Sequence, residues 1–475
     1  MKVRTRFAPS PTGFMHLGGL RTALYAYLYA KHNNGDFILR IEDTDQGRYV
    51  EGATELIYSS LKESGMIYDE GPDVGGNYGP YIQSERKQIY LDYAKKLIEL
   101  GGAYYCFCTK ERLETLTDKN GNRKYDKHCL KLSKEEVERR IASGEPYVIR
   151  QNIPTEGISS YNDLIYGTIE VDYNELEDNI LIKSDGMPTY NFANVIDDHL
   201  MGISHVIRGT EYLSSTPKYN LMYDAFGWGR PVYIHLPPIM KDATRKLSKR
   251  YGDANFDDFV KKGYVEEAII NYVALLGWCP KNNLEKMTMS EMVENFDLTG
   301  ISKSQSIFDE VKCRWLNGEY LKAMSDEEFV TRATPFLSDD LKKFDVNKLC
   351  RLVKSRVEIL SEVNDKLSLF TTFTAPESAL YENNKQKSSV ELAKKVIPLL
   401  IEKIPTITNF VNDEIFATLS GFATELELKS KTLFYIMRIA ITGLEVTPGG
   451  ATEIAEILGK NECIARLNAS LQKLW

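Results

Sequence analysis

The spacing of hydrophobic and polar residues changes period twice within the first forty positions. Residues 3–8 predict a short strand, and residues 37–41 (FILRI) predict a second one. Between them, apolar side chains recur at helical spacing and predict a helix over about residues 18–32. A strand, a helix and a second strand in this order favour a β-α-β unit and a parallel sheet.

The next signals of the same sheet come much later, at residues 205–207 and 232–234. The stretch between, roughly residues 73–197, is therefore predicted to be an insertion. It contains both kinds of element: expected helices over 85–100 and 133–143, and expected strands over 147–150 and 180–182.

Strand signals fade beyond about residue 325. The remainder is predicted to form successive amphipathic helices, separated at Pro376, at Pro405 and at the Pro448-Gly449-Gly450 turn. The pattern thus predicts an α/β fold, in which a split nucleotide-binding domain carries an insertion and precedes an all-helical C-terminal half.

The connection after the first strand, APSPTGFMHLGGLRTAL, is longer than chain reversal requires. It leads from a parallel strand into a helix, which is where open α/β sheets bind ligands. Gly18 and Gly19 let the backbone approach a bound group, and the helix N-terminus suits phosphate. The loop matches neither the dinucleotide nor the P-loop pattern. His16 either stabilises a phosphorus transition state here or merely caps the helix, and on this stretch alone both interpretations stand.

A second stretch, MKDATRKLSKRYGDANF, gathers five basic residues within positions 241–250, where Asp242 is the only acid. Runs of charge are usually solvated loops. This run, however, follows a strand and two prolines where the chain returns to the sheet. Lys246 and Lys249, with Ser248 between them, are typical of a mobile clamp for a triphosphate. The run therefore favours the catalytic interpretation of His16.

Composition and charge narrow the class of protein. A chain of 475 residues is too long for one core, so two to four domains are expected. Hydrophobic residues make up 43% and charged residues 27%, as in globular proteins, and no apolar run is long enough for a membrane span. The N-terminus lacks the apolar stretch of a signal peptide, so the seven cysteines indicate a reducing cytosol. The net charge of −8 argues only weakly against nucleic acid, because a basic surface can hide within the sum.

Several motifs in order resemble those of bacterial glutamyl-tRNA synthetase, a class I aminoacyl-tRNA synthetase. PSPTGFMHLGG resembles the "HIGH" signature of that class, and KLSKR resembles its "KMSKS" signature. The narrower match rests on RFAPSPTG, GGLRTAL, LRIEDTD, YDEGPDVGG, YIQSER and SDGMPTYNFANVIDDHLMGISHVIRGTEYLSSTP. The resemblance runs from residue 2 to the C-terminus.

The resemblance implies ATP-dependent ligation of glutamate to tRNA(Glu) through a glutamyl-adenylate, with release of pyrophosphate and AMP. It implies that His16 and Lys249 contact the phosphates in the transition state and that Lys246 assists them. Mg²⁺ is expected to arrive with ATP rather than in a protein cage. The residues expected to bind ATP are Gly18, Gly19, Glu211, Tyr212 and Lys249.

Glutamate carries two carboxylates and one ammonium, so complementary charges are expected around it. Arginine suits the carboxylates because its guanidinium can bind them bidentately. Glu42 is expected to take the ammonium, whereas Asp43 and Asp45 are expected to form a solvated acidic turn. The resemblance places six residues at this site: Arg6, Ser10, Glu42, Tyr190, Asn194 and Arg208.

The resemblance also divides the chain into functional parts. These are a split Rossmann-like catalytic domain (1–72 and 198–242), an inserted acceptor-end-binding domain (73–197), a stem-contact region with the KLSKR loop (243–325) and a helical anticodon-binding region (326–475). Basic residues of the insertion are expected to contact tRNA phosphates: Lys110, Arg112, Arg123, Lys124, Lys127, Lys131 and Lys134. Arg356, in VKSRVEIL, is expected to read the third anticodon base, with a plain surface arginine as the alternative.

A metal site is predicted in YYCFCTKERLETLTDKNGNRKYDKHCLKLS. Cys106 and Cys108 are two apart in an extended run, so both thiols point to one face, and Cys129 follows some twenty residues later. With a fourth donor they would form a structural Zn²⁺ site. The Y-x3-C spacing found in some members of the family favours Tyr125 as that donor, whereas ligand chemistry favours His128. Free thiols are the alternative.

Other functions stay open at this stage. An enzyme that also charges tRNA(Gln) is the nearest, and a non-catalytic tRNA-binding protein is more remote because His16, Lys246 and Lys249 are all present. A short paralogue that modifies a tRNA base would lack the C-terminal half, and a small-molecule nucleotidyltransferase would not need it. The expected partners are tRNA(Glu), ATP and L-glutamate, for a monomer in the cytoplasm that binds no membrane.

Overall fold

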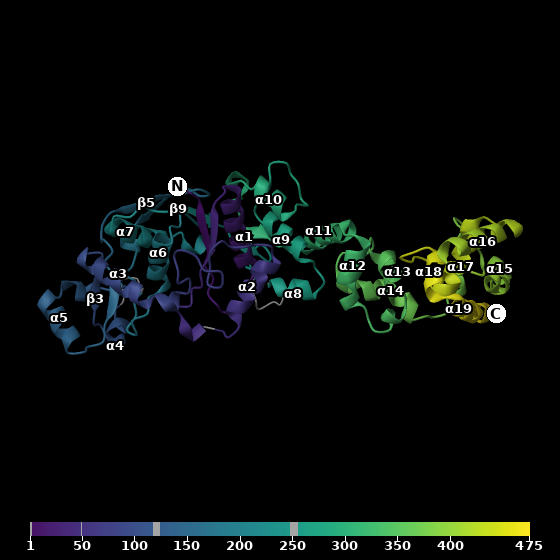
Figure 1. Ribbon diagram of the computed structural model, residues 1–475, viewed down its shortest axis with the longest axis horizontal. Helices are drawn as coiled ribbons and strands as arrows, with labels where there is room; N and C mark the ends of the chain where they lie inside the picture. The colour runs from purple at the N-terminus through teal and green to yellow at the C-terminus, as the bar shows by residue number, and fades with distance from the viewer. Residues whose placement is uncertain (1, 49, 117–123, 248–254) are drawn as a thin grey trace. The chain divides into compact units, whose positions relative to one another are not determined.

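The computed structural model describes residues 2–48, 50–116, 124–247 and 255–475 (Figure 1). The chain forms two compact units. The first comprises Met1–Phe259 and Ile269–Asp309, and the second comprises Val260–Ala268 and Glu310–Trp475. Within the described residues, no helix is long and apolar enough to cross a membrane.

The sheet of the first unit begins with the predicted β-α-β unit. Strand β1 (Arg4–Phe7) pairs in parallel with β2 (Asp36–Leu39), and β8 (His205–Gly209) pairs in parallel with β9 (Val232–Leu236). Ser204, just before β8, donates its backbone N–H to Arg4 O at 3.0 Å, so that β1 and β8 are neighbours. The four strands confirm the prediction made from the spacing of hydrophobic residues.

Helix α1 (Leu17–His32) joins β1 to β2 and packs against both. Its buried side chains recur at helical spacing, and His16 caps its N-terminus. Past its C-terminus, Gly35 is required by a close approach, because a Cβ there would lie 2.2 Å from Val3 O. The helix thus begins and ends within about one residue of the bounds that the sequence predicts.

A hairpin extends this sheet from within the predicted insertion. Strand β5 (Ile158–Asp163) pairs antiparallel with β6 (Gly167–Asp172) and parallel with β9, where Asp163 lies opposite Tyr233. The strand order is therefore β6-β5-β9-β8. The hydrophobic pattern had predicted no strand here, and its pairing with β9 links two segments some seventy residues apart in the chain.

The rest of the insertion is a small antiparallel sheet packed against helices, as Figure 1 shows around the labels β3, α3 and α6. The sheet has the order β3-β4-β7, and its core includes Leu97, Ile149, Leu181 and Phe192. Its elements are β3 (Ala103–Cys106), β4 (Val148–Gln151), β7 (Ile180–Ile182), α3 (Lys87–Glu99), α4 (Lys110–Glu114), α5 (Lys134–Ala142) and α6 (Tyr190–Leu200). Helix α7 (Thr216–Phe226), which follows the predicted insertion in the chain, packs against the same core. The remaining elements before residue 310 are α2 (Ala53–Glu63), β10 (Ile239–Met240), α8 (Phe256–Lys261), α9 (Glu266–Leu275), α10 (Met289–Asn295) and β11 (Ser306–Ile307).

From Glu310 onward the regular structure is helical, as predicted, and one hydrophobic core runs through the second unit. Helix α17 is buried along most of its length and contacts α15, α16, α18 and α19. Pro405 falls in the break between α15 and α16, where a helix was expected to end. The helices are α11 (Glu310–Ala323), α12 (Asp326–Ala333), α13 (Val346–Val353), α14 (Val363–Thr371), α15 (Val390–Lys403), α16 (Asn412–Glu425), α17 (Ser430–Thr442), α18 (Ala451–Leu458) and α19 (Lys460–Leu474).

Candidate active site

A cavity of about 680 Å³ opens at the carboxyl ends of β1 and β8. Parallel strands that end at one edge of a sheet bring their following residues together there. Eight of the predicted site residues line this cavity: Arg6, Ser10, Gly19, Glu42, Tyr190, Arg208, Glu211 and Tyr212. Arg48, Lys183 and Asp45 line it too. The first two were not predicted, because each lies just outside a motif: Arg48 follows LRIEDTD and Lys183 precedes SDGMPTYNF.

His16 and Gly18 lie at the start of α1, outside this lining. His16 Nδ1 accepts a hydrogen bond from Gly18 N at 3.0 Å, so the capping interpretation is realised. Because Nδ1 is the acceptor, a neutral imidazole carries its proton on Nε2. A Cβ on Gly19 would meet nothing within 4 Å, which leaves room above the helix N-terminus. His16 can therefore cap the helix through Nδ1 and still donate a hydrogen bond through Nε2.

The basic run is described only in part. Lys246 is exposed, beside a turn in which Asp242 accepts hydrogen bonds from the backbone of Thr244 and Arg245, both at 3.0 Å. Arg245 Nε also donates to Asp242 at 2.7 Å, so this arginine is paired within its own loop. Lys249, together with Ser248 and Arg250, lies outside the described residues.

Tyr190 and Asn194 both lie on the first turns of α6. The Tyr190 ring lines the cavity and packs against Tyr212, with centroids 5.2 Å apart. Asn194 is buried and does not line the cavity, because its Nδ2 donates to Tyr190 O at 2.6 Å. This hydrogen bond ties Asn194 to the turn that carries Tyr190.

A buried network of charges lies directly behind the cavity. Arg6 Nε and Nη2 contact Asp198 at 3.0 and 3.2 Å, and Arg40 donates to Asp198 and Glu42, both at 2.8 Å. Three arginines thus balance three carboxylates: Arg6, Arg40 and Arg86 against Glu42, Asp197 and Asp198. A balanced network is needed because an uncompensated buried charge is costly.

This network affects the ionisation of Glu42 and Asp198. Burial raises the pKa of Glu42, although Arg40 opposes the shift. For Asp198, burial alone would raise the pKa, but Arg6 and Arg40 outweigh it and hold the pKa below its ordinary value. The only hint in the sequence was the Asp197-Asp198 pair at the end of the apolar run FANVI. Asp43, by contrast, accepts a hydrogen bond from Ser84 N at 2.8 Å and does not line the cavity.

Arg208 ends β8 and is buried, with 5% of its surface exposed. Its Nε donates to His235 and its Nη2 to Thr216, so both of these protein acceptors are uncharged. Among the described residues, no carboxylate lies within ion-pair distance of it. A buried guanidinium that lines a cavity and lacks an anionic partner is suited to an anionic ligand.

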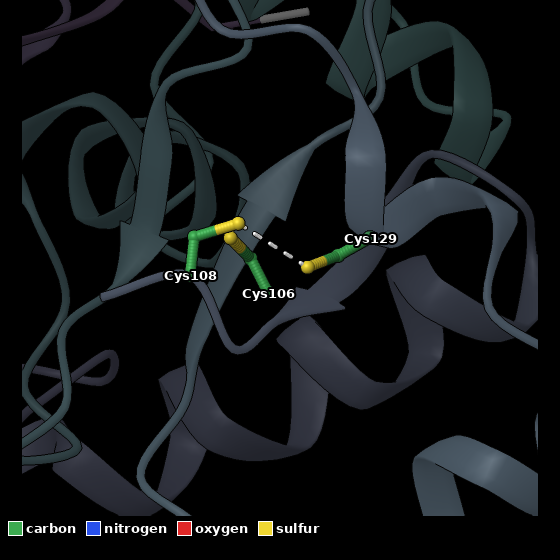
Figure 2. Close-up of side chains that lie close together, drawn as sticks. All are labelled: Cys106, Cys108 and Cys129. Atoms are coloured by element: carbon green, nitrogen blue, oxygen red, sulfur yellow. Dashed lines mark hydrogen bonds between the residues drawn. The ribbon is translucent and has the colours of Figure 1, made fainter. Parts of the chain in front are cut away.

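Three cysteines of the insertion converge at the end of β3. Figure 2 shows the sulfur atoms of Cys106, Cys108 and Cys129, which lie within 4.8 Å of one another. Tyr125 Oη lies 3.4 Å from Cys106 Sγ and 3.6 Å from Cys108 Sγ. His128 is exposed and does not belong to this group. The fold therefore brings together the Tyr125 set rather than the His128 set.

Several of the basic residues expected to face tRNA have partners within the insertion. Lys127 pairs with Asp178 at 2.7 Å and Arg112 pairs with Asp126 at 2.6 Å. Lys124 Nζ donates to Asn174 O at 2.7 Å. Arg123 lies outside the described residues. These pairs tie the cysteine-bearing loop to the rest of the insertion.

In the second unit, Arg356 is exposed in the turn that follows α13.

A parallel sheet with a charged cavity at the carboxyl ends of its strands, bordered by Gly19 of the HLGG segment at the start of α1, is the architecture of a class I tRNA synthetase. The family model "tRNA synthetases class I (E and Q), catalytic domain" matches residues 2–315, and that of an anticodon binding domain matches residues 328–471. The chain belongs to the glutamate–tRNA ligase family.

Relatives and solved structures agree with this assignment over the full length. The chain is 54% identical to a glutamate–tRNA ligase of Clostridium kluyveri, covering 100% of this chain and 98% of the other. It is 53% identical to one of Clostridium botulinum, covering 100% and 99%. The crystal structure of a glutamate tRNA ligase from Elizabethkingia meningosepticum, in complex with its amino acid, superposes with a TM-score of 0.87 at 37% identity, covering 100% of both chains.

Proposed function

We propose that this chain, an ATP-dependent glutamate–tRNA ligase, activates glutamate in the cavity at the ends of β1 and β8. The observation that carries the proposal is Arg208, a buried guanidinium without an anionic partner among the described residues, on the same cavity as the Glu42 carboxylate. An amino acid with a carboxylate side chain and an ammonium group complements both charges.

In this proposal the side-chain carboxylate of glutamate binds Arg208, and its ammonium binds Glu42. Arg6 is already paired with Asp198, so it contributes mainly by holding the Asp198 side of the network in place. Tyr190, positioned by Asn194, and Ser10 border the amino acid. The opposite charges fix the orientation of the substrate, which is the main contribution a protein can make to this chemistry.

The first step joins the α-carboxylate of glutamate to the α-phosphorus of ATP. A carboxylate oxygen forms the new P–O bond while the bond to the β-phosphate oxygen breaks, and pyrophosphate leaves with the electron pair. His16 Nε2–H, the N-terminus of α1 at Gly18 and Gly19, Lys246 and Lys249 are proposed to stabilise the phosphates. Glu211 and Tyr212 border the nucleotide, and Mg²⁺ bound with ATP would neutralise part of the phosphate charge.

The second step moves the glutamyl group to the terminal ribose of tRNA(Glu). A ribose hydroxyl attacks the acyl carbon, and AMP leaves. We assign the acceptor end to residues 73–197, the stem to 243–325 and the anticodon to 326–475. Arg356 is proposed to read the third anticodon base, and its exposure in the turn after α13 supports this role. If it fails to discriminate, the enzyme also charges tRNA(Gln).

We also propose a structural Zn²⁺ held by Cys106, Cys108, Tyr125 and Cys129. A tetrahedron with metal–sulfur bonds of about 2.3 Å has sulfur–sulfur edges of about 3.8 Å and sulfur–oxygen edges of about 3.5 Å. The 3.5 Å between Cys108 and Cys129 and the 3.4 Å between Cys106 and Tyr125 are close to these edges.

The surroundings of the sulfurs support the same site. Each sulfur accepts a 3.4 Å contact from an N–H donor, from Arg150 to Cys106, from Arg112 to Cys108 and from Phe107 N to Cys129, as thiolate ligands require. With four protein ligands no position is open, so zinc would shape the acceptor-end surface and take no part in the reaction.

An aminoacylation assay tests the function as a whole. Purified enzyme is given ATP and Mg²⁺ with glutamate or glutamine, and with purified tRNA(Glu) or tRNA(Gln). The expected result is glutamylation of tRNA(Glu) with AMP formation, and no product from glutamine. Product from glutamine would contradict the role of Arg208, whereas equal charging of both tRNAs would favour the non-discriminating enzyme.

We further propose a monomer acting in the cytoplasm, consistent with seven cysteines that form no disulfide.

A further inference from the structure

Three side chains from three strands form a hydrogen-bonded chain behind the cavity. Arg208, at the end of β8, donates from Nε to His235 Nε2 at 3.1 Å. His235 lies on β9, and its Nδ1 is 2.7 Å from Asp163 Oδ2 at the end of β5. His235 and Asp163 are inaccessible to solvent, at 0% and 1% exposure. The chain is therefore a fixed part of the interior, with Arg208 as its only member on the cavity.

The protonation of His235 is set from both sides. Asp163 accepts N–H donors from the backbone of Ile165 and Tyr166, both at 2.9 Å, and from His235 N at 3.0 Å. A carboxylate in that position is an acceptor, so His235 Nδ1 must donate to it. Arg208 has no lone pair to offer, so His235 Nε2 must accept. The imidazole is thus neutral, with its proton on Nδ1.

These contacts determine which part of Arg208 is available to a ligand. Nε is bound to His235, and Nη2 donates to Thr216 Oγ1 at 2.7 Å. The guanidinium carbon lies 4.9–5.5 Å from three aromatic rings: Tyr212, Tyr219 and Tyr233. The rings restrict the plane of the guanidinium and the two hydrogen bonds restrict its rotation. Of the five N–H groups, the two on Nη1 are not used in these contacts, and because Arg208 lines the cavity we expect them to serve the ligand.

We propose that His235, oriented by Asp163, is a positioning residue for glutamate recognition, because it fixes Arg208 without neutralising its charge. The inference rests on the proposed role of Arg208. A carboxylate at this position would hold the guanidinium equally well, but it would cancel the charge that attracts the substrate. A neutral imidazole provides a fixed acceptor and leaves the full positive charge for the ligand.

The same arrangement predicts a dependence on pH. The groups that face His235 are Arg208, Asp163, Thr216 and the Tyr233 ring, and Glu211 acts on it at longer range. Burial lowers the pKa of His235 below its ordinary value. Below that pKa, Nε2 would carry a proton and the ring a positive charge directed at Arg208. Glutamate binding should therefore weaken in acid, while ATP binding is unaffected.

Two amide substitutions separate positioning from a merely structural role. His235→Gln places an amide where Nε2 stood, so it can still accept from Arg208. His235→Asn places its amide nearer Asp163 and leaves Arg208 Nε without an acceptor. Both remove the imidazole from the core, so each serves as the control for the other. With saturating ATP and tRNA, we expect the KM for glutamate to rise at least tenfold in His235→Asn and to stay within threefold in His235→Gln, with the KM for ATP unchanged in both.

Equal glutamate KM values in the two folded variants would overturn the inference. If either variant fails to fold, the unmodified enzyme still gives a test: as the pH falls from 7.5 past the ordinary histidine pKa of 6.5 and through the lower pKa of His235, its KM for glutamate should rise while its KM for ATP stays level. A KM for glutamate that stays constant down to the lowest pH at which the enzyme remains folded would also overturn the inference. Arg208→Ala distinguishes failure of the proposed role of Arg208 from failure of the positioning role of His235. If it does not raise the KM for glutamate, the role of Arg208 fails, whereas a rise there without one in His235→Asn rejects only the positioning role.

Discussion

Arg40 donates a 2.8 Å hydrogen bond to Glu42, and its side chain is completely inaccessible to solvent. The same guanidinium reaches Asp198 at 2.8 Å, so one arginine on the segment after β2 joins the cavity wall to α6. The ionised form of Glu42, which its proposed contact with the ammonium of glutamate requires, therefore depends on a residue that lines no part of the cavity.

Arg40→Leu should destabilise the first unit by about 3–5 kcal/mol, because Glu42 would be left buried without its ion-pair partner and Asp198 would keep only Arg6. Urea unfolding measures the change. Arg230→Leu is the matched control: its partner Asp224 is half exposed, and loss of such a pair costs below about 1 kcal/mol. Equal unfolding midpoints for the two variants would show that the buried network does not hold the unit together.

Arg208→Ala should lower kcat/KM for glutamate by the equivalent of about 2–5 kcal/mol, since a charged contact to the substrate carboxylate is lost. The KM for ATP should not change. Arg208→Lys should recover only part of the loss, because an ammonium cannot make the same pair of contacts. Steady-state aminoacylation gives these constants. A value for Arg208→Ala within threefold of the unmodified enzyme would exclude the assignment.

His16→Asn separates the two roles that the sequence leaves open for His16. Asparagine is a good N-cap, so the stability of α1 should be retained, but the donating Nε2–H is lost. We expect kcat to fall at least tenfold with little change in the unfolding midpoint. His16→Ala should lose about 1 kcal/mol of stability as well. A His16→Asn enzyme with full kcat would leave His16 as a cap alone.

Protein purified without chelator should contain close to one zinc per chain by metal analysis, and Cys106→Ser should lower this content. Cys279→Ser is the control, because that cysteine is exposed and lies outside the group. Tyr125→Phe should weaken zinc retention and His128→Ala should not, as the positions of their side chains indicate. Fully active, freshly prepared enzyme without zinc would refute the site.

Arg356→Gln should raise the charging of tRNA(Gln) that reads CAG relative to tRNA(Glu). A guanidinium can donate to the acceptor edge of cytosine while its plane stacks, and glutamine keeps a polar side chain without the charge. The ratio of the two kcat/KM values measures the effect, with Arg351→Gln, a neighbouring exposed arginine paired with Asp326, as the control. An unchanged ratio would remove Arg356 from tRNA selection.

The elements that the sequence predicts correctly are those set by near neighbours. Residues 17–32 form α1 because an apolar stripe and a capping residue both lie within one short segment. The Cys-x-Cys spacing likewise places two sulfurs on one side of an extended chain before any tertiary contact forms. The motifs that identify the family are of the same kind, since each is a short run with its chemistry in sequence.

Tertiary structure alone decided the partners that come from distant segments. The pairing of β5 with β9 depends on which edge of the sheet is available, and an isolated hairpin carries no signal of it. The contacts Arg40–Asp198 and Arg208–His235 join residues 158 and 27 positions apart, and buried polar groups have to find such partners once water is excluded. The choice of Tyr125 over His128 had the same origin: spacing allowed both, and the fold buried one beside the sulfurs and exposed the other. Local periodicity thus determined the elements and their chemistry, while the need to satisfy buried charges determined which side chains act together.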